Sequence, residues 1–221
     1  MRVVSAEEGY RLWAESFDAS GSPIVALEAR HLAPWLADLA GLRVIDVGCG
    51  TGRWMKFSTA RGAQAIGTDI TREMLRKAAH TNRALVEADG RRLPFRDACA
   101  DMVLCTLTIG HMRPVGDALR ELGRIARPGG HVIVTDFHPE ALRRGWKRTF
   151  SNAGETCEIE TSPYSLDELS CSLLELEQFR ELSFDEPERH LFTAAGKPTL
   201  FDQGRGMPAI WIAQFRRRPR K

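Results

Sequence analysis

The middle of the chain alternates between short apolar runs and segments of helical spacing. Runs rich in β-branched residues, such as LRVIDV at 42–47, predict buried strands. The predicted strands are 42–47, 63–69, 84–89, 100–107 and 131–137. The helical patterns between them are 52–61, 71–80 and 114–126. This alternation predicts an α/β fold in which helices cover both faces of a parallel sheet.

Two helical patterns precede this alternating region. Tyr10, Trp13 and Phe17 lie at spacings of three and four, which places them on one face of a helix over 6–17. A second helical pattern covers 23–39 and begins with proline, which suits the first turn of a helix.

The last third of the chain has a different pattern. The segment 148–161 predicts a β-hairpin that turns at SNAG. Ser165 and Glu168 form a capping box, and the leucines that follow at helical spacing predict a helix over 162–179. The chain then ends in two predicted strands and a polar loop between them, at 180–187, 209–217 and 188–208.

Composition narrows the class of protein. The chain has 221 residues, of which 43% are hydrophobic and 27% charged, as in ordinary globular domains. It contains no apolar run near the ~18 residues that a membrane span needs, and its N-terminus lacks a secretory pattern. We therefore expect a cytoplasmic protein. The five cysteines show no metal-binding or redox spacing, so we expect neither a disulfide framework nor a metal site.

The net charge of +2 is unevenly distributed. The last six residues, RRRPRK, carry five positive charges, so the rest of the chain is weakly acidic. A basic tail can touch nucleic acid or an anionic membrane, but a terminal segment of this kind is more often simply solvated. The acidic body argues against a nucleic-acid-binding surface.

Three glycines follow the first predicted strand of the alternating region. Gly48, Gly50 and Gly52 form a G-x-G-x-G loop, which lets a ligand approach the backbone before the next helix begins. Dinucleotide oxidoreductases use G-x-G-x-x-G instead. The strand also carries Asp46, which would repel a pyrophosphate and attract a cationic group. The loop therefore favours a ligand with a positive charge at this end.

Two more acids stand at or near the ends of the next strands. Asp69 can accept hydrogen bonds from both ribose hydroxyls, as an acid does in nucleotide-binding folds. Asp89 can accept one from the exocyclic amino group of adenine. Together with Asp46 they fit a cationic amino acid, a ribose and an adenine in a row, which are the parts of S-adenosylmethionine (SAM).

With these residues in place, the chain resembles a known family. VIDVGCGTGRW, AIGTDIT, EADGRRLPFRDACADMVLCTLTIGHM and ELGRIARPGGHVIVTDF are similar to the class I SAM-dependent methyltransferases, in the type-11 group related to the ubiquinone/menaquinone-biosynthesis enzymes. The resemblance implies a Rossmann-like three-layer sandwich. Its seven-stranded, mostly parallel sheet would have the order 3-2-1-4-5-7-6 and an antiparallel last strand.

The resemblance also implies where the ligand lies. SAM, and its product S-adenosylhomocysteine, would contact Asp46, Gly48, Cys49, Gly50, Gly52, Asp69, Ile70, Asp89, Gly90, Cys105, Thr106 and Leu107. Tyr10 and Trp13 belong to a segment like the family's N-terminal lid, where they either cover the sulfonium with aromatic faces or fill the core. Phe17 stands where the family often has tyrosine.

Two histidines are candidate general bases for removing a proton from the methyl acceptor. His111 follows the fourth strand and His138 the fifth, at the edge where such sheets bind ligands. The family's counterpart of His111 lies in an L-H-H run whose first histidine is Gly110 here. Further polar residues follow the fifth strand and would cover the pocket, namely Asp136, Glu140, Arg143, Arg148 and Tyr164.

The pattern predicts a single methyltransferase domain over 1–221. In it, 1–40 would form lid helices, 41–137 the SAM-binding core, and 138–221 the acceptor-facing hairpin, helix and final strands. We expect methyl transfer to a small-molecule acceptor by in-line displacement. A tRNA, rRNA or protein methyltransferase and a non-catalytic SAM-binding protein are the alternatives. The chain lacks the N/D-P-P-Y motif of amino-group methylation, with CTLT in its place.

Overall fold

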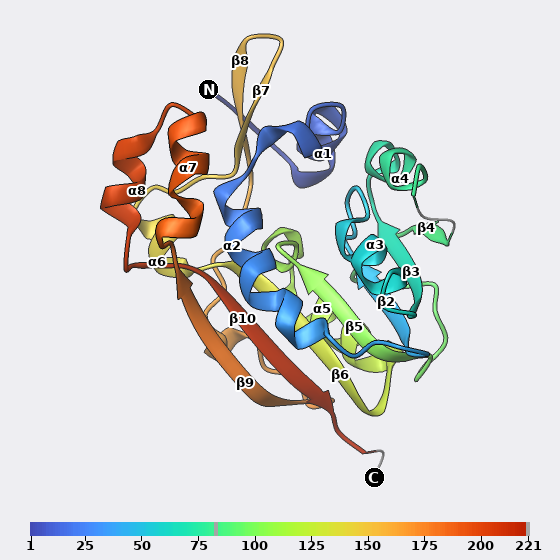
Figure 1. Cartoon of the computed structure of the whole chain (residues 1–221). Coiled ribbons are helices and arrows are strands. Elements are labelled where there is room, and N and C mark those ends of the chain that lie inside the picture. Colours follow the sequence, from blue (N-terminus) through green and yellow to red (C-terminus); the bar gives the residue numbers. More distant parts are fainter. Residues whose placement is uncertain (82–83, 220–221) are drawn as a thin grey trace.

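A seven-stranded sheet forms the centre of the computed structural model, which describes residues 1–81 and 84–219 (Figure 1). Its order is β4-β3-β2-β5-β6-β10-β9, and β10 runs antiparallel to both of its neighbours. This confirms the predicted fold class and strand order. The strands are β2 (Arg43–Val47), β3 (Gln64–Asp69), β4 (Leu85–Glu87), β5 (Ala100–Thr106), β6 (Ala126–Phe137), β9 (Leu174–Ser183) and β10 (Pro208–Arg217). The last two residues of the basic tail lie outside the described residues.

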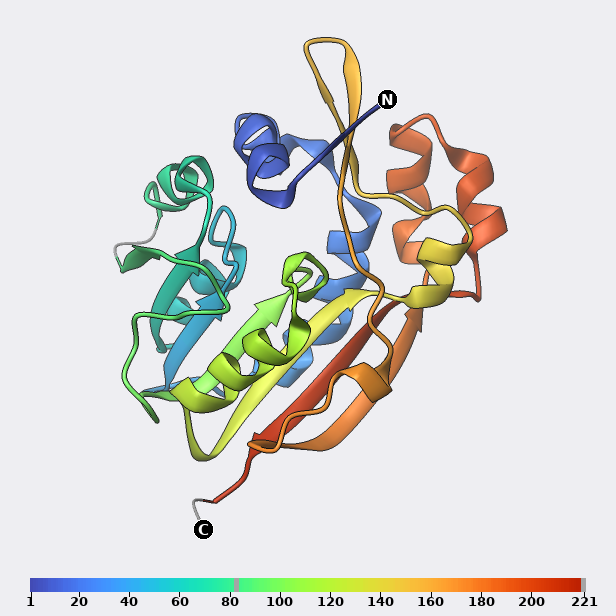
Figure 2. The ribbon, with the colours of Figure 1, turned by 180° about the vertical axis from the view of Figure 1, so that it is seen from behind.

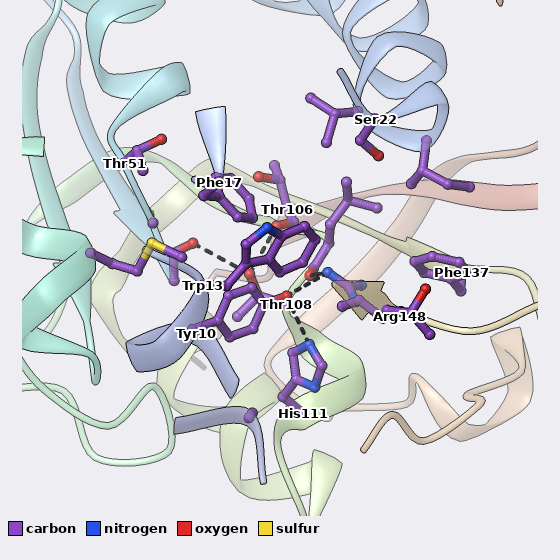
Figure 3. Close-up of a pocket in the computed structure, with 18 of the residues that line it drawn as sticks. Tyr10, Trp13, Phe17, Ser22, Thr51, Thr106, Thr108, His111, Phe137 and Arg148 are labelled. Carbon is purple, nitrogen blue, oxygen red and sulfur yellow. Dashed lines mark hydrogen bonds between the residues drawn. The ribbon is translucent and has the colours of Figure 1, made fainter. Parts of the chain in front are cut away.

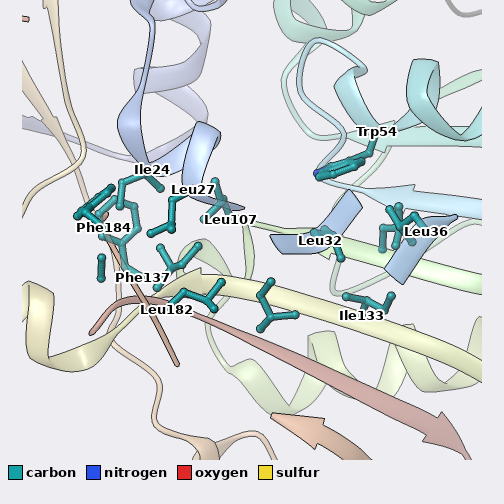
Figure 4. Packing of buried hydrophobic residues seen from close by; sticks show 14 of the residues in the cluster. Ile24, Leu27, Leu32, Leu36, Trp54, Leu107, Ile133, Phe137, Leu182 and Phe184 are labelled. Carbon is teal, nitrogen blue, oxygen red and sulfur yellow. The ribbon is translucent and has the colours of Figure 1, made fainter. Parts of the chain in front are cut away.

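Helices cover both faces of this sheet and make three layers. On one face, α2 (Pro23–Leu32) and α3 (Arg53–Thr59) bury Leu27 and Trp54 in a shared core. Figure 4 shows Ile24, Leu27 and Leu32 of α2 beside Leu182 and Ile133 of the strands. On the other face lies α5 (Val115–Ile125), seen in front of the sheet in Figure 2. The helix α4 (Arg72–Ala78) follows β3 and contacts it.

A small second sheet and a helix lie beyond the carboxyl ends of the parallel strands (Figure 2). The sheet has the order β1-β8-β7 and consists of β1 (Arg2–Val4), β7 (Thr149–Asn152) and β8 (Glu155–Ile159). The hairpin β7–β8 was predicted, whereas β1 was not. The helix α1 (Ala6–Trp13) packs on it so closely that a Cβ at Gly9 would lie 2.6 Å from Ile159. We call β1, α1, β7 and β8 the roof.

The helix predicted over 162–179 is wrong. Its capping box is real, but it starts only a 3₁₀ turn at Leu166–Glu168, and β9 begins at Leu174. Backbone pairing with β10 along the sheet edge outweighs the local helical spacing. Leu176, which a helix would have buried, is 41% exposed on this edge strand.

The polar loop predicted over 188–208 is also wrong, because two helices occupy it. They are α7 (Glu186–Ala194) and α8 (Pro198–Gly204), and Asp185 with Glu188 caps the first of them. Phe192 and Phe201 bury their rings in the same core as α2. The short helix α6 (Pro139–Arg143) leads from β6 toward the roof. Among the described residues, no helix is long and apolar enough to cross a membrane.

A buried carboxylate on α2 joins three elements. Glu28 is fully buried, and its two oxygens accept hydrogen bonds from Arg53 of α3 and from the hydroxyl of Thr135 on β6. The indole Nε1 of Trp54 donates to the same carboxylate at 3.2 Å. These bonds fix α2 against the helix that follows the glycine loop.

Replacing Glu28 by alanine should destabilise the fold strongly. The substitution removes the acceptor of the Trp54 indole and of the Thr135 hydroxyl, and each buried donor left unsatisfied costs about 1–3 kcal/mol. Arg53 also loses its partner, but its side chain is 35% exposed and can be solvated. Urea unfolding would measure the loss. Glu87→Ala is the matched control, because the Glu87–Arg72 pair is exposed on both sides and contributes about 0–1 kcal/mol. Equal losses in both variants would contradict this role of Glu28.

Candidate active site

A cavity of about 1110 Å³ lies at the carboxyl ends of the central strands, below the roof. The glycine loop, the ends of β3 and β5, and residues of α1, α2 and α7 line it. Figure 3 shows Thr51 of the glycine loop on one side and Phe137 and Arg148 on the other, with aromatic side chains between them. The fold therefore brings the predicted ligand loop and the predicted acceptor segment to one space.

The three loop glycines have different structural roles. All have positive φ, a conformation that side chains disfavour. A Cβ at Gly48 would lie 2.2 Å from the Thr108 side chain, so this glycine is required by internal packing. A Cβ at Gly50 would meet nothing within 4 Å, and Gly50 lines the cavity. Gly52 is the N-cap of α3 and lies outside the lining. Gly50 is thus the glycine that leaves room for a ligand.

Asp69 lines the cavity and also holds the glycine loop. Its Oδ2 accepts from the Gly50 N–H at 2.9 Å, and its Oδ1 accepts from the Thr71 N–H at 2.8 Å. Burial raises the pKa of this carboxyl, and the hydrogen bonds from Thr71 and Gly50 oppose that shift. Each oxygen keeps a second lone pair for a ligand hydroxyl. Ile70 beside it also lines the cavity.

Asp89 and Gly90 line the cavity just beyond β4. The side chain of Arg91 pairs with the Asp89 carboxylate at 2.6 Å and lowers its pKa. Gly90 packs tightly, since a Cβ there would lie 2.4 Å from the Met112 methyl group. The arginine pair was not expected from the sequence, and it orients the acid that faces the cavity.

Asp46 lies outside the cavity lining and is almost completely buried in β2. Its Oδ1 has no hydrogen-bond partner among the described residues. Burial raises the pKa of this carboxyl to about 7, with smaller raising effects from Glu28 and Asp69 and an opposing effect from Arg53. Direct contact with a ligand ammonium, as expected from the sequence, does not fit this position. Cys105 is likewise buried outside the lining.

The other predicted ligand residues do line the cavity, namely Cys49, Thr106, Leu107, Tyr10 and Trp13. Trp13 stacks on Phe150 of the hairpin, with ring centroids 5.2 Å apart. Tyr10 packs edge-on against both Phe17 and His111. The aromatic residues of α1 are therefore part of the roof core and of the cavity wall at once.

A chain of hydrogen bonds crosses the cavity wall opposite the glycine loop. Arg148 donates to the Tyr10 hydroxyl at 2.7 Å, and this hydroxyl lies 3.2 Å from His111 Nε2. The other ring nitrogen, Nδ1, lies 2.7 Å from the Glu160 carbonyl oxygen and must donate to it. Tyr10 therefore donates to Nε2, and the chain runs in one direction with a neutral imidazole.

His111 is held as a neutral ring. Burial lowers its pKa to about 3, and the nearby Arg148 charge acts in the same direction. Gly110 has no room for a side chain, because a Cβ there would lie 2.9 Å from Asp136. The Gly110 N–H instead donates to this carboxylate at 2.6 Å. Glycine in place of the family's first histidine is therefore built into the packing.

His138, the second candidate base, is turned away from the cavity. It is the N-cap of α6, where its Nδ1 accepts from the Glu140 N–H at 3.1 Å. Its Nε2 lies 2.9 Å from Glu181 on β9. His138 is not among the described residues that line the cavity. The strand end that suggested a catalytic role is used for a helix cap.

The sequence placed Arg148 among several polar residues near the pocket but did not indicate that it is buried in the cavity wall. Its side chain is 11% exposed, lines the cavity and pairs with buried Asp136 at 3.2 Å. Nothing in the sequence separates it from Arg143 and Arg144, which pair with Glu140 on α6. Among the described residues there is no cluster of side chains that could hold a metal ion.

The chain is similar in sequence to known methyltransferases. A family model described as a methyltransferase domain matches residues 45–134. The malonyl-[acyl-carrier protein] O-methyltransferase of Pectobacterium atrosepticum is 28% identical over 94% of this chain and 77% of that protein. The demethylmenaquinone methyltransferase of Corynebacterium kroppenstedtii is 33% identical over 44% of this chain and 42% of that protein.

The fold also matches a solved structure. The S-adenosylmethionine dependent methyltransferase from Mesorhizobium loti superposes with a TM-score of 0.68 at 19% identity, over 89% of this chain and 100% of that chain. The strand order is the one expected for a class I methyltransferase, and the matched methyltransferase domain includes the glycine loop after β2. Residues 45–134 form a methyltransferase domain of the class I SAM-dependent, type-11 family.

Proposed function

We propose that this methyltransferase transfers the methyl group of SAM to a small-molecule acceptor by in-line displacement. The observation that carries the proposal is that one cavity joins the glycine-loop side to a second side lined by Tyr10, His111 and Arg148. The two relatives described above are named for methyl transfer to malonyl-[acyl-carrier protein] and to demethylmenaquinone. A nucleic-acid acceptor has no comparable support.

The residues on the glycine-loop side fit SAM. Gly50 offers open space beside the backbone, Asp69 keeps free lone pairs for the ribose, and Asp89 with Gly90 would hold the adenine. The Asp46 carboxyl, whose pKa burial raises to about 7, lies beneath the loop with an unpartnered oxygen, and a cationic amino acid bound nearby would favour its ionised form. When bound, SAM supplies a methyl group already activated by its sulfonium.

The remaining task of the chain is to align the acceptor and exclude water. Alignment alone can supply about 7–11 kcal/mol of barrier reduction at best. The roof covers the cavity with Tyr10 and Trp13, and Phe17, which follows α1, adds a third ring; their aromatic faces suit a positive sulfonium. The lid role predicted for 1–40 therefore extends to the hairpin 148–161. His111 accepts a hydrogen bond from the Tyr10 hydroxyl and so helps to fix the roof, and it does not act as a free general base.

Incubation with methyl-labelled SAM and fractionated cell metabolites or RNA tests the function. Label should enter the small-molecule fraction. Label found in RNA alone would contradict a small-molecule acceptor. Tight binding of SAM without transfer to any fraction would indicate a binding protein instead of an enzyme.

Asp69→Ala should weaken SAM binding by about tenfold or more, which is ~1.4 kcal/mol. The substitution removes the ribose acceptor and releases the Gly50 N–H that orders the loop. Calorimetric titration with SAM measures the change. Glu73→Ala, on the neighbouring helix and outside the cavity lining, should bind normally. Unchanged affinity in Asp69→Ala would show that the ribose does not lie there.

Gly50→Ala and Gly48→Ala should fail in different ways. At Gly50 the new Cβ projects into open space, so SAM affinity should fall more than stability does. At Gly48 the Cβ meets Thr108, so the melting temperature should fall by several degrees. Titration and thermal unfolding of both variants separate the two effects. Equal stability losses in both variants would contradict a packing role for Gly48 and a ligand-binding role for Gly50.

A further inference from the structure

Charged side chains are distributed unevenly along the cavity wall. Asp69 and Asp89 line the glycine-loop side, and Asp18 joins them through a 2.7 Å hydrogen bond from Thr51. The cations on the other side come from the segment after α6 and from the α7–α8 region, namely Arg144, Lys147, Arg148 and Lys197. Glu7 of α1 also lines the cavity. Arg53 and Arg91 line the glycine-loop side as well, where they pair with Glu28 and Asp89. Acidic side chains therefore lie mainly on the cofactor side, and the acceptor side has the larger number of basic ones.

Arg148 is the most buried of these cations, and its hydrogen bonding is incomplete. Its Nη1 donates to Tyr10 and to the Leu107 carbonyl at 2.9 Å, and its Nη2 faces Asp136. Its Nε–H has no partner among the described residues. An unsatisfied buried donor costs about 1–3 kcal/mol, which a bound acceptor would offset. A guanidinium in this state is suited to an anionic ligand group.

An apolar arm of the cavity lies next to this cation. The Arg148 guanidinium lies over the Phe137 ring, with 4.8 Å between Cζ and the ring centroid. Trp146 continues the wall and stacks on Phe184 of the core at 5.2 Å. Further apolar side chains of α2, α7 and α8 complete the arm, namely Ile24, Val25, Leu191, Phe192 and Leu200. The acceptor side therefore joins one anion-binding group to a hydrophobic channel.

We propose that the acceptor is a carboxylic acid with an apolar chain, whose carboxylate is bound by Arg148 and whose chain lies between α2, Trp146 and α7. This inference rests on the proposed methyl transfer and names its acceptor class. One carboxylate oxygen forms a bond to the methyl carbon while the carbon–sulfur bond breaks, and the electron pair remains on sulfur. The products are a methyl ester and neutral S-adenosylhomocysteine.

The state of His111 agrees with such an acceptor. A carboxylic acid, with a pKa of about 4 to 5, is already ionised at neutral pH, so no base has to remove a proton. Both ring nitrogens of His111 are engaged, one with Tyr10 and one with the Glu160 carbonyl. A phenol or an alcohol, in contrast, would have to give its proton to a free base at this place. A carboxylate needs a positive anchor, which Arg148 provides.

Transfer of labelled methyl from SAM to octanoate, with 1-octanol and a hydroquinone as competing acceptor classes, tests the inference. Octanoate methyl ester should form, and the two other compounds should gain no label. Arg148→Met should lower kcat/KM for octanoate by about 100-fold, which is ~2.7 kcal/mol, while the Kd for SAM changes less than about threefold. Arg143→Ala, an exposed arginine of α6, is the matched control and should be unaffected.

A second variant keeps the test decisive if Arg148→Met does not fold. Val25→Trp narrows the apolar arm, so it should shift the preference toward shorter acids than octanoate without altering SAM affinity. Unchanged chain-length preference, or octanoate methylation within threefold of normal in Arg148→Met, would overturn the inference. SAM binding with label only in the hydroquinone would overturn it as well and leave methyl transfer standing. Absence of SAM binding would overturn the proposed function itself.

Discussion

The buried carboxylate of Glu28 is the contact on which the site depends. It lies on α2, yet it accepts from Arg53 and Trp54 of the helix after the glycine loop and from Thr135 of β6. A buried charge is tolerated only when it is fully hydrogen-bonded, so these elements cannot shift independently. Because α2 also forms one wall of the cavity, the same contact fixes the distance between the cofactor loop and the acceptor side.

The roof covers the cavity, although it is not part of the main sheet. Its own small core contains Val4, Phe150, Cys157 and Ile159, and Trp13 bridges it to the cavity by stacking on Phe150. The Arg148–Tyr10–His111 chain then connects the roof to the ends of β5 and β6. Arg148 therefore has two roles: it lines the acceptor side of the cavity as a cation, and its hydrogen bond to Tyr10 holds the roof in place.

The sequence predicted the central fold well because each parallel strand is a buried apolar run with a helix after it. It failed where long-range pairing decides, as at β9, whose leucines have helical spacing but lie on a sheet edge. It failed again at α7 and α8, because their apolar faces consist of a few separated residues such as Phe192 and Phe201. Local pattern carries no information about which distant surface will bury them.

The chain by itself determined the methyltransferase family, the glycine loop, and the acids at the strand ends, because backbone geometry and ligand charge require those residue types in that order. Only the tertiary structure decided which of them face the cavity. Asp46 and Cys105 are buried, His138 caps a helix, and Gly50, unlike Gly48, has open space beside it. Arg148 reaches the cavity because the hairpin folds back over the sheet, where the side chain contacts Tyr10 and Asp136. No local sequence pattern encodes contacts between such distant segments.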